Sequence, residues 1–165
     1  MSQDIFVSVL IPAKNEANNL KPLLEEIRVA LADEAYEIIV VDDGSTDSTL
    51  QELRQIRHDG LDTLRILHHE RSLGQSTSLY HAAREARGQW LATLDGDGQN
   101  DPADIPGMLA LVRGEPGQVD VQLVAGHRVT RRDTASKRYA SRFANNLRRR
   151  LLKDCLLYTS DAADE

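Results

Sequence analysis

Two carboxylates, Asp95 and Asp97, carry the strongest chemical signal in this 165-residue chain. They directly follow the apolar segment Trp90-Leu-Ala-Thr-Leu94. In an extended backbone, residues i and i+2 point the same way, so both carboxylates can converge on one cation. Their hard oxygen atoms suit Mg²⁺ or Mn²⁺, which proteins commonly share with substrate phosphates. At the carboxyl end of a strand in an α/β sheet, this arrangement predicts a metal-assisted nucleotide site.

The run that starts at Asp95 also fits a surface turn, because Asp, Gly, Asn and Pro are the usual residues of turns. A calcium loop of the EF-hand type is excluded. Such a loop needs Gly at its sixth position and Glu at its twelfth, where this chain has Asn100 and Pro106. A metal site and a turn remain as the two interpretations.

The chain has no glycine-rich phosphate loop. Its first strand-like segment is followed by Pro12-Ala-Lys-Asn-Glu16, and neither GxGxxG nor the Walker A pattern occurs in the sequence. We therefore do not expect a glycine-rich turn to hold phosphates here. A metal ion on Asp95 and Asp97 is the remaining means of binding a diphosphate.

A second acidic cluster, Asp42, Asp43 and Asp47, follows the apolar run 38–41. An acidic residue at this strand end can accept hydrogen bonds from a nucleobase or a ribose. The same residues can cap the following helix, and we expect at least one to do so. A phosphoacceptor receiver domain is disfavoured. Its acidic pair follows the first strand and a Lys ends its fifth, whereas the fifth segment here ends in Gly126-His-Arg128.

Two adjacent histidines, His68 and His69, end the third strand-like segment. Neighbouring residues of a strand point to opposite faces, so we do not expect them to chelate one zinc ion. We interpret them as strand-end residues. His127 beside Arg128 is the better site candidate, because it ends a predicted strand on the same sheet edge as Asp95.

Alternating strand-like and helix-like segments position these residues. Five runs rich in Val, Ile and Leu have the character of parallel strands buried on both faces, at 6–11, 37–41, 64–67, 90–94 and 121–125. Four helix-like segments lie among them, at 18–32, 48–57, 75–87 and 105–113. This alternation predicts one α/β domain with a mostly parallel sheet flanked by helices.

Charge is divided unevenly along the chain. Residues 1–126 contain 10 Lys and Arg against 21 Asp and Glu, whereas residues 127–153 contain 10 Lys and Arg against Asp133 alone. The basic block is either a solvated helix face or a surface for an anionic partner. Nucleic acid is disfavoured, because the block lies on one helix-like segment without aromatic residues suited to base stacking.

No apolar run reaches the length of a transmembrane helix, and the polar start Met1-Ser-Gln-Asp4 does not resemble a signal peptide. A single cysteine, Cys155, excludes an internal disulfide and fits a reducing cytoplasm.

In order, these motifs resemble the N-terminal part of a family 2 glycosyltransferase with the GT-A (Rossmann-like) fold. The matching segments are Val7-Ser-Val-Leu-Ile-Pro-Ala-Lys-Asn-Glu16, Glu37-Ile-Ile-Val-Val-Asp-Asp-Gly-Ser-Thr-Asp47, Gly74-Gln-Ser76, Asp95-Gly-Asp-Gly-Gln-Asn-Asp-Pro102 and Gly126-His-Arg128. The match spans roughly residues 5–150. The Asp-x-Asp-x-Gln-x-x-Pro form and the basic stretch after Arg128 are most similar to the branch that includes dolichol-phosphate mannose synthase.

The resemblance implies a set of donor-site residues. Nucleotide-sugar contacts would come from Pro12, Ala13, Glu16, the Val41 backbone, Asp43, Asp95, Gly96 and Asp97. Ligands of Mg²⁺ or Mn²⁺ would be Asp95, Asp97 and Gln99. Arg128 would face the diphosphate or the acceptor phosphate, with Lys137, Arg138 and Ser141 nearer the acceptor. Lys14 departs from the family pattern, which often has an aromatic residue there, and leaves the choice of base open.

The resemblance further implies inverting transfer of a sugar from a nucleotide donor such as GDP-mannose or a UDP-sugar to a polyprenyl phosphate. The protein would work at the cytoplasmic face of the membrane, with Asp97 and Arg128 as the catalytic residues. Such an acceptor is already an anion near neutral pH, because a phosphate monoester has a second pKa of about 6, so no general base is needed. The alternatives are extension of a polysaccharide, lipid or protein glycan, and a fragment that binds donor without transfer.

The last residues differ in character from the rest. The run Cys155-Leu-Leu-Tyr-Thr-Ser-Asp-Ala-Ala-Asp-Glu165 resembles the translation of a sequencing adapter. We expect residues 1–154 to be the donor-binding part of a truncated glycosyltransferase domain and residues 155–165 to be a non-native tail. Cys155 would then carry no information on redox compartment.

Overall fold

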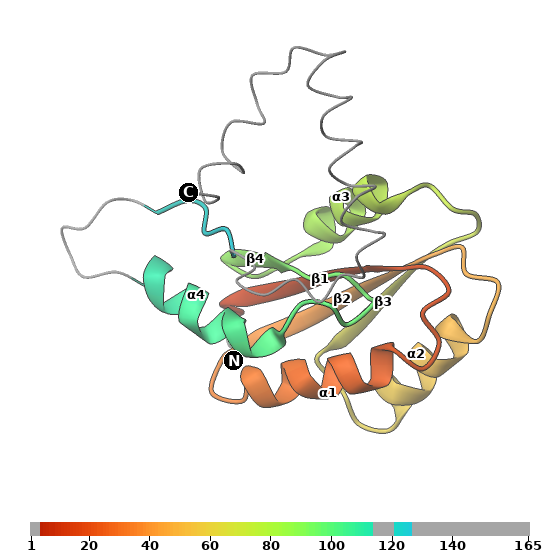
Figure 1. Cartoon of the computed structure of the whole chain (residues 1–165), viewed down its shortest axis with the longest axis horizontal. Helices are drawn as coiled ribbons and strands as arrows, with labels where there is room; N and C mark the ends of the chain where they lie inside the picture. The colour runs from red at the N-terminus through yellow and green to blue at the C-terminus, as the bar shows by residue number, and fades with distance from the viewer. Residues whose placement is uncertain (1–3, 114–120, 127–165) are drawn as a thin grey trace, which may run out of the picture. The chain divides into compact units, whose positions relative to one another are not determined.

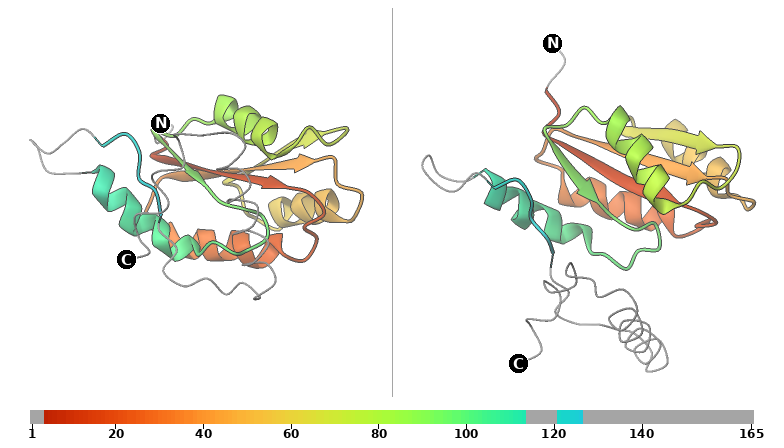
Figure 2. Two further views of the ribbon diagram at one scale, coloured as in Figure 1. Left: turned by 45° about the horizontal axis from the view of Figure 1, so that its top comes forward. Right: turned by 90° about the horizontal axis from the view of Figure 1, so that it is seen from above.

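The computed structural model describes residues 4–113 and 121–126. Its sheet contains four parallel strands in the spatial order β3-β2-β1-β4, with bounds β1 (Val7–Ala13), β2 (Tyr36–Asp43), β3 (Leu64–His69) and β4 (Trp90–Thr93). The helices are α1 (Leu20–Ala30), α2 (Thr49–His58), α3 (Gln75–Glu85) and α4 (Ile105–Val112), with the 3₁₀ turn η1 (Pro102–Asp104) before α4. Helices α1 and α2 lie on one face of the sheet and α3 lies on the other (Figures 1 and 2).

All strand pairs are parallel, so their carboxyl ends share one edge of the sheet. Val7 of β1 lies opposite both Tyr36 of β2 and Trp90 of β4, and Ile38 of β2 lies opposite Leu64 of β3. The loops that leave the ends of the four strands therefore meet at this edge. In open α/β sheets, this is the edge at which ligands bind.

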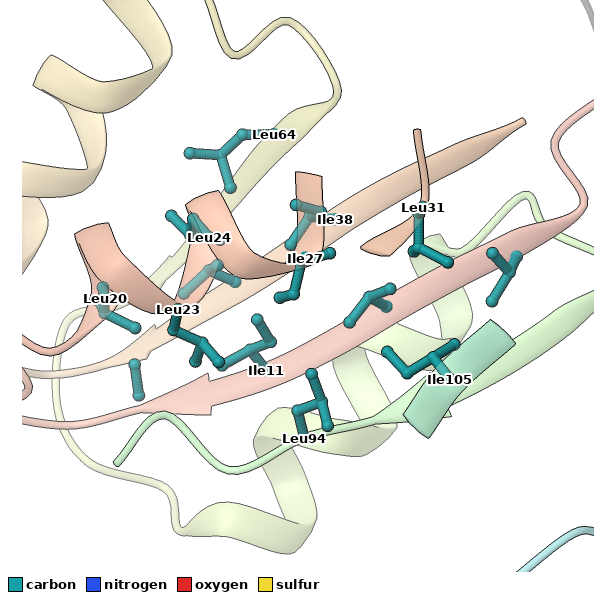
Figure 3. Close-up of a cluster of buried hydrophobic side chains, with 14 of the residues drawn as sticks. Ile11, Leu20, Leu23, Leu24, Ile27, Leu31, Ile38, Leu64, Leu94 and Ile105 are labelled. Carbon is teal, nitrogen blue, oxygen red and sulfur yellow. The ribbon is translucent and has the colours of Figure 1, made fainter. Parts of the chain in front are cut away.

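Alternation along β1 and β2 divides the core into two layers. The larger cluster lies between the sheet and α1, where Ile11 and Ile38 pack against a stripe of helical residues (Figure 3). On the other face, Leu10, Ile39 and Val41 pack against Ala82 of α3. Because successive strand residues face opposite layers, a strand covered on both faces is a nearly continuous apolar run.

Helix α1 forms because apolar residues recur at helical spacing. Leu20, Leu23, Leu24 and Ile27 are all buried on its inner face, and each fully buried side chain of this kind stabilises the fold by roughly 1.5–3 kcal/mol. Pro22 lies in the first turn, where its missing N–H has no partner within the helix. The outer face is charged and solvated, so the helix packs in one orientation.

The predicted parallel α/β architecture is confirmed, and the ends of its four helices and first four strands lie within two residues of the prediction. The predicted fifth strand at 121–125 is wrong. Residues 121–126 have no regular secondary structure, and Leu123 is 84% exposed. A strand requires hydrogen bonds from a neighbouring edge, and within the described residues this segment pairs with none of the four strands.

Within residues 4–113 and 121–126, no helix combines the length and hydropathy needed to cross a membrane. The basic segment 127–153 and the predicted tail at 155–165 lie outside the described residues.

Candidate functional site

A cavity of about 440 Å³ opens at the carboxyl edge of the sheet. Loops from all four strands contribute to its wall, which consists of Pro12, Ala13, Lys14, Glu16, Asp43, Ser72, Gly74, Gln75, Asp95, Gly96 and Asp97. The structure thus brings together seven residues that the sequence placed in a nucleotide-sugar site, although they come from segments more than 80 residues apart. Val41 is fully buried in the core beside α3 and does not line the cavity.

The loop between β1 and α1 is held by its backbone amides. The N–H groups of Asn15, Glu16, Ala17 and Asn18 each donate to a different side chain at the start of α2, at 2.8–3.2 Å. These acceptors are, in order, Ser45, Thr49, Asp47 and Glu52. Four successive amides at the start of a helix would otherwise suit an anion. In this loop the four amides are already paired with side chains of the protein.

Two features of this loop explain its shape. Asn15 and Asn18 have φ angles of +56° and +73°, a left-handed region that Asn tolerates better than most residues. The side chain of Asn15 also accepts a hydrogen bond from the Thr46 backbone at 2.8 Å. The loop therefore presents Pro12 to Glu16 to the cavity from a fixed backbone.

Asp95 and Asp97 belong to the part of the wall that follows β4. Asp95 accepts a hydrogen bond from Gln75 Nε2 at 2.9 Å, while Asp97 accepts one from the backbone N–H of Gln99 at 3.1 Å. The second bond is a turn contact, so the surface-turn interpretation is correct in geometry. It does not exclude the metal interpretation, because both carboxylates also line the cavity.

The donor set fits a hard divalent cation only in part. Among residues 4–113 and 121–126, no group of three or more His, Cys, Asp and Glu side chains is arranged to hold a metal. Asp95 and Asp97 offer carboxylate oxygens, and a substrate diphosphate supplies further oxygens in sites that hold Mg²⁺ through few protein ligands. Gln99, the predicted third ligand, is exposed and is not a wall residue.

Gly96 keeps the two halves of the wall close together. A Cβ atom at this position would lie 3.2 Å from the Pro12 carbonyl oxygen and 3.4 Å from Cγ of Glu16. Glycine therefore allows the loop after β4 to approach the loop after β1. Any larger residue here would push the two loops apart.

Asp43 is 4% exposed and accepts four hydrogen bonds. The donors are His69 Nδ1 at 2.8 Å, Ser72 Oγ at 2.7 Å, and the backbone N–H groups of Leu73 and Gly74 at 2.8 and 2.9 Å. Burial by itself raises the pKa of this carboxyl, but the four hydrogen bonds outweigh it and hold the pKa far below its usual range. Asp43 is therefore an ionised group that fixes the turn before α3.

The other two acidic residues of the cluster have structural parts. Asp47 accepts from the Thr49 backbone at 3.0 Å in the first turn of α2, whereas the N-cap residue of this helix is Ser48, which makes no side-chain capping hydrogen bond. Asp42 is fully buried and accepts from the Ser45 backbone at 3.2 Å and from His68 at 2.9 Å. Neither residue lines the cavity.

The histidines that end β3 gain partners that the sequence analysis missed. His68 and His69 point to opposite faces, as predicted, and each pairs with the aspartate that lies opposite it on β2. His69 also contacts His81 of α3. The sequence offered one signal for these pairs, because two aspartates end one strand and two histidines end the next. Only the strand register shows that they lie opposite each other.

Arg128, Lys137, Arg138 and Ser141 lie outside the described residues, so their predicted parts remain predictions. His127 lies there as well. Lys14 is on the cavity wall, which places a cation at the position where an aromatic residue was expected from the family pattern.

Comparison with known proteins identifies the family. A model described as glycosyl transferase family 2 matches residues 8–162. This match extends past residue 154, where we expect the native sequence to end, and that boundary remains a prediction.

Two curated relatives show the same likeness. The chain is 38% identical over 134 residues to a dodecaprenyl-phosphate galacturonate synthase of Rhizobium johnstonii, covering 79% of this chain and 38% of the relative. It is 35% identical over 142 residues to an undecaprenyl-phosphate 4-deoxy-4-formamido-L-arabinose transferase of Pseudomonas fluorescens, covering 84% and 40%. The chain thus spans about two fifths of the length of these relatives.

Solved structures confirm the predicted GT-A fold. TarS of S. aureus in complex with UDP superposes with a TM-score of 0.55 at 26% identity, covering 66% of this chain and 32% of that one. Glucosyl-3-phosphoglycerate synthase of Mycobacterium tuberculosis, solved with Mn²⁺, UDP and glucosyl-3-phosphoglycerate, gives a TM-score of 0.52 at 28% identity, covering 67% and 41%.

Proposed function

Because the chain belongs to glycosyl transferase family 2, we propose that the protein transfers a sugar from a nucleoside-diphosphate sugar to a polyprenyl phosphate. The observation that carries this proposal is the shared cavity wall, where Asp95 and Asp97 face the loop after β1 at the carboxyl edge of a parallel sheet. The names of the two curated relatives, which both specify a polyprenyl phosphate, support the acceptor class.

On this proposal, the loop after β1 holds the nucleotide. Pro12, Ala13 and Glu16 form one side of the cavity, and Lys14 adds a positive charge suited to a phosphate or a polar base edge. A contact between Asp43 and the base or ribose stays a prediction. It would require one of the four present donors to give way, because a carboxylate has about four lone-pair sites.

Asp95 and Asp97 would hold Mg²⁺ or Mn²⁺, and Gln99 would join them only after its turn rearranges. A bound ion supplies positive charge that stabilises the diphosphate as it leaves. Gln75 keeps Asp95 in place through its 2.9 Å hydrogen bond, so the carboxylate does not reorganise when the donor binds.

The transfer balances without a proton acceptor. An oxygen of the acceptor phosphate forms a bond to the anomeric carbon, while the bond from that carbon to the diphosphate oxygen breaks and its electron pair leaves with the nucleotide. Attack from the opposite side inverts the anomeric configuration. Arg128 would stabilise the leaving diphosphate, and Lys137, Arg138 and Ser141 would bind the acceptor phosphate near the cytoplasmic membrane face.

Calorimetric titration of the full chain with UDP and with GDP, each with and without Mn²⁺, tests the donor site. We expect binding that requires Mn²⁺ and is lost in Asp97→Asn. Asp104→Asn is the matched control, because Asp104 is exposed, lies in the same segment and makes no capping hydrogen bond. Equal binding by both variants would overturn the assignment of Asp97.

A second assay tests the acceptor. Radiolabelled sugar from the preferred donor class is offered with undecaprenyl phosphate or with undecaprenol. We expect transfer to the phosphate alone, because the alcohol needs a general base. Transfer to a glycan with none to either lipid would favour the alternative of glycan extension.

A further inference from the structure

The contact between His69 and His81 lies directly behind the cavity wall and has no part in the function proposed above. His69 Nδ1 is 2.8 Å from Asp43 Oδ1, and His69 Nε2 is 2.9 Å from His81 Nδ1. The two rings meet edge to face, with centroids 5.0 Å apart and planes at 88°. Three side chains from β2, β3 and α3 therefore form one continuous chain of hydrogen bonds.

Chemistry assigns the protons in this chain. An ionised carboxylate only accepts, so the proton between Asp43 and His69 is on His69 Nδ1. When His69 is neutral, its Nε2 carries a lone pair, and His81 Nδ1 must then donate to it. Both neutral rings are then in the Nδ1–H form, because the tautomer of each ring is set by the hydrogen bonds that it makes.

The charged and titratable groups next to the pair include Asp43 on β2 and, from α3, Tyr80, whose ring lies 5.8 Å from that of His81, with Arg84 over Tyr80.

We propose that His81 and His69 are positioning residues for the donor site, with His81 fixing the tautomer of His69 and His69 fixing Asp43. Asp43 in turn holds the backbone of Leu73 and Gly74 and the hydroxyl of Ser72. Ser72 and Gly74 are wall residues.

The same turn leads directly into Gln75, the donor to Asp95. The arrangement thus connects a histidine on α3, which does not line the cavity, to both sides of the cavity. Its effect on donor binding rests on the proposed function, whereas the tautomers and the hydrogen-bond chain do not.

Long-range ¹H–¹⁵N correlation spectra of the full chain, without any ligand, test the proposed tautomers of His69 and His81. Signals of the five histidines are assigned with His69→Asn and His81→Phe. We expect His69 and His81, when neutral, both to carry their proton on Nδ1. A neutral His69 with its proton on Nε2 would overturn the proposal.

Two substitutions of His69 test its proposed effect on donor binding. His69→Asn keeps an amide N–H near the position of Nδ1, whereas His69→Leu removes the donor that residue 69 offers to Asp43 and leaves the other three. With Mn²⁺ and UDP or GDP, whichever the unmodified chain binds, we expect Kd to rise about tenfold in His69→Leu and less than about twofold in His69→Asn, since a hydrogen bond to a charged group is lost only in the first. His81→Phe should fall between them.

His58→Gln is the control, because His58 is 85% exposed at the end of α2 and is not a wall residue, and it should leave Kd unchanged. Equal weakening by His69→Leu and His69→Asn would overturn the positioning role. An unmodified chain that shows the expected tautomers but binds neither nucleotide would overturn the proposed function and leave the hydrogen-bond chain supported.

Discussion

Two neighbouring pairs of the same residue types end strands β2 and β3 and differ in what surrounds them. Asp42 pairs with His68 on the side of the sheet that α1 and α2 cover, and Asp43 pairs with His69 on the side of α3. His68 is 41% exposed and has one carboxylate partner, while His69 is 9% exposed and lies between Asp43 and His81. The Asp42–His68 pair therefore only links two strands, whereas the Asp43–His69 pair is the centre of a hydrogen-bond network.

The difference comes from the donors that each carboxylate collects. Asp42 receives a backbone N–H from Ser45 besides His68, whereas Asp43 receives three further donors from one turn. Only the second pair therefore determines where a loop lies. A buried charged pair by itself is weak evidence for stability. The number of hydrogen bonds that the carboxylate accepts decides how much stability is lost when it is replaced.

The largest effect is expected for Asp43→Asn. An amide has one acceptor oxygen and faces some of the four donors with its own NH₂ group, so we expect the free energy of unfolding to fall by about 4 kcal/mol. Asp42→Asn should cost about half as much, since it disturbs two hydrogen bonds. Urea denaturation of both variants measures the comparison, and equal losses would contradict it.

Gly44→Ala disturbs the turn before α3 without removing any hydrogen bond of Asp43. Gly44 has a φ angle of +66°, and an added Cβ would lie 2.6 Å from the backbone of Arg71 and Ser72. We expect a loss of about 3 kcal/mol from strain and overlap together, with weaker nucleotide binding. Gly60→Ala is the matched control, because Gly60 also has a positive φ but open space around it, so it should cost less and leave binding unchanged.

Glu37→Gln tests whether a buried carboxylate on the same face of β2, but at the far end of the sheet, affects the cavity. Glu37 is 3% exposed and accepts from Ser8 Oγ, Arg65 and the Arg87 backbone at 2.7–2.9 Å. We expect a loss of about 2 kcal/mol in unfolding free energy with unchanged nucleotide affinity. A change in affinity would show that stability alone, and not the network around Asp43, controls binding.

The acid dependence of stability follows from the same two carboxyls. Burial by itself raises the pKa of Glu37, yet its hydrogen bonds to Arg65, the Arg87 backbone and Ser8 lower the pKa below 4.5, and the pKa of Asp43 is likewise lowered from 3.8. Their stabilisation is therefore present above these ordinary values and is lost as the pH falls through the lowered ones. Unfolding free energy should decline with acid below about pH 4.5, with a shallower slope in Asp43→Asn and in Glu37→Gln.

The smallest effect is expected for His68→Gln. The side chain is partly solvated, and a glutamine amide can still donate to Asp42, so the loss should be below about 1 kcal/mol. Nucleotide affinity should not change. Urea denaturation of His68→Gln and His69→Leu measures the comparison. Equal losses of unfolding free energy would show that the difference in exposure does not separate the two pairs.

Much of the site was accessible from local sequence. The continuous apolar runs of β1 and β2 predicted parallel strands, and the rule that ligands bind at the carboxyl edge brought Asp43 and Asp95 to one place. The family resemblance added Pro12. The segment at 121–125 shows the limit of the same reasoning. Its apolar residues satisfy the local pattern of a strand, but among the described residues it has no neighbouring edge to pair with.

The sequence by itself determined the first four strands, the helices and the edge at which the acidic residues gather, because apolar runs and helical spacing act over a few residues. Only the tertiary structure decided which side chains meet there. The contacts of Asp43 with His69, of Gln75 with Asp95 and of Asn18 with Glu52 join residues 20 to 34 positions apart. Strand register and helix packing fix these distances, and a shift of one residue in register would turn His69 to the other face of the sheet.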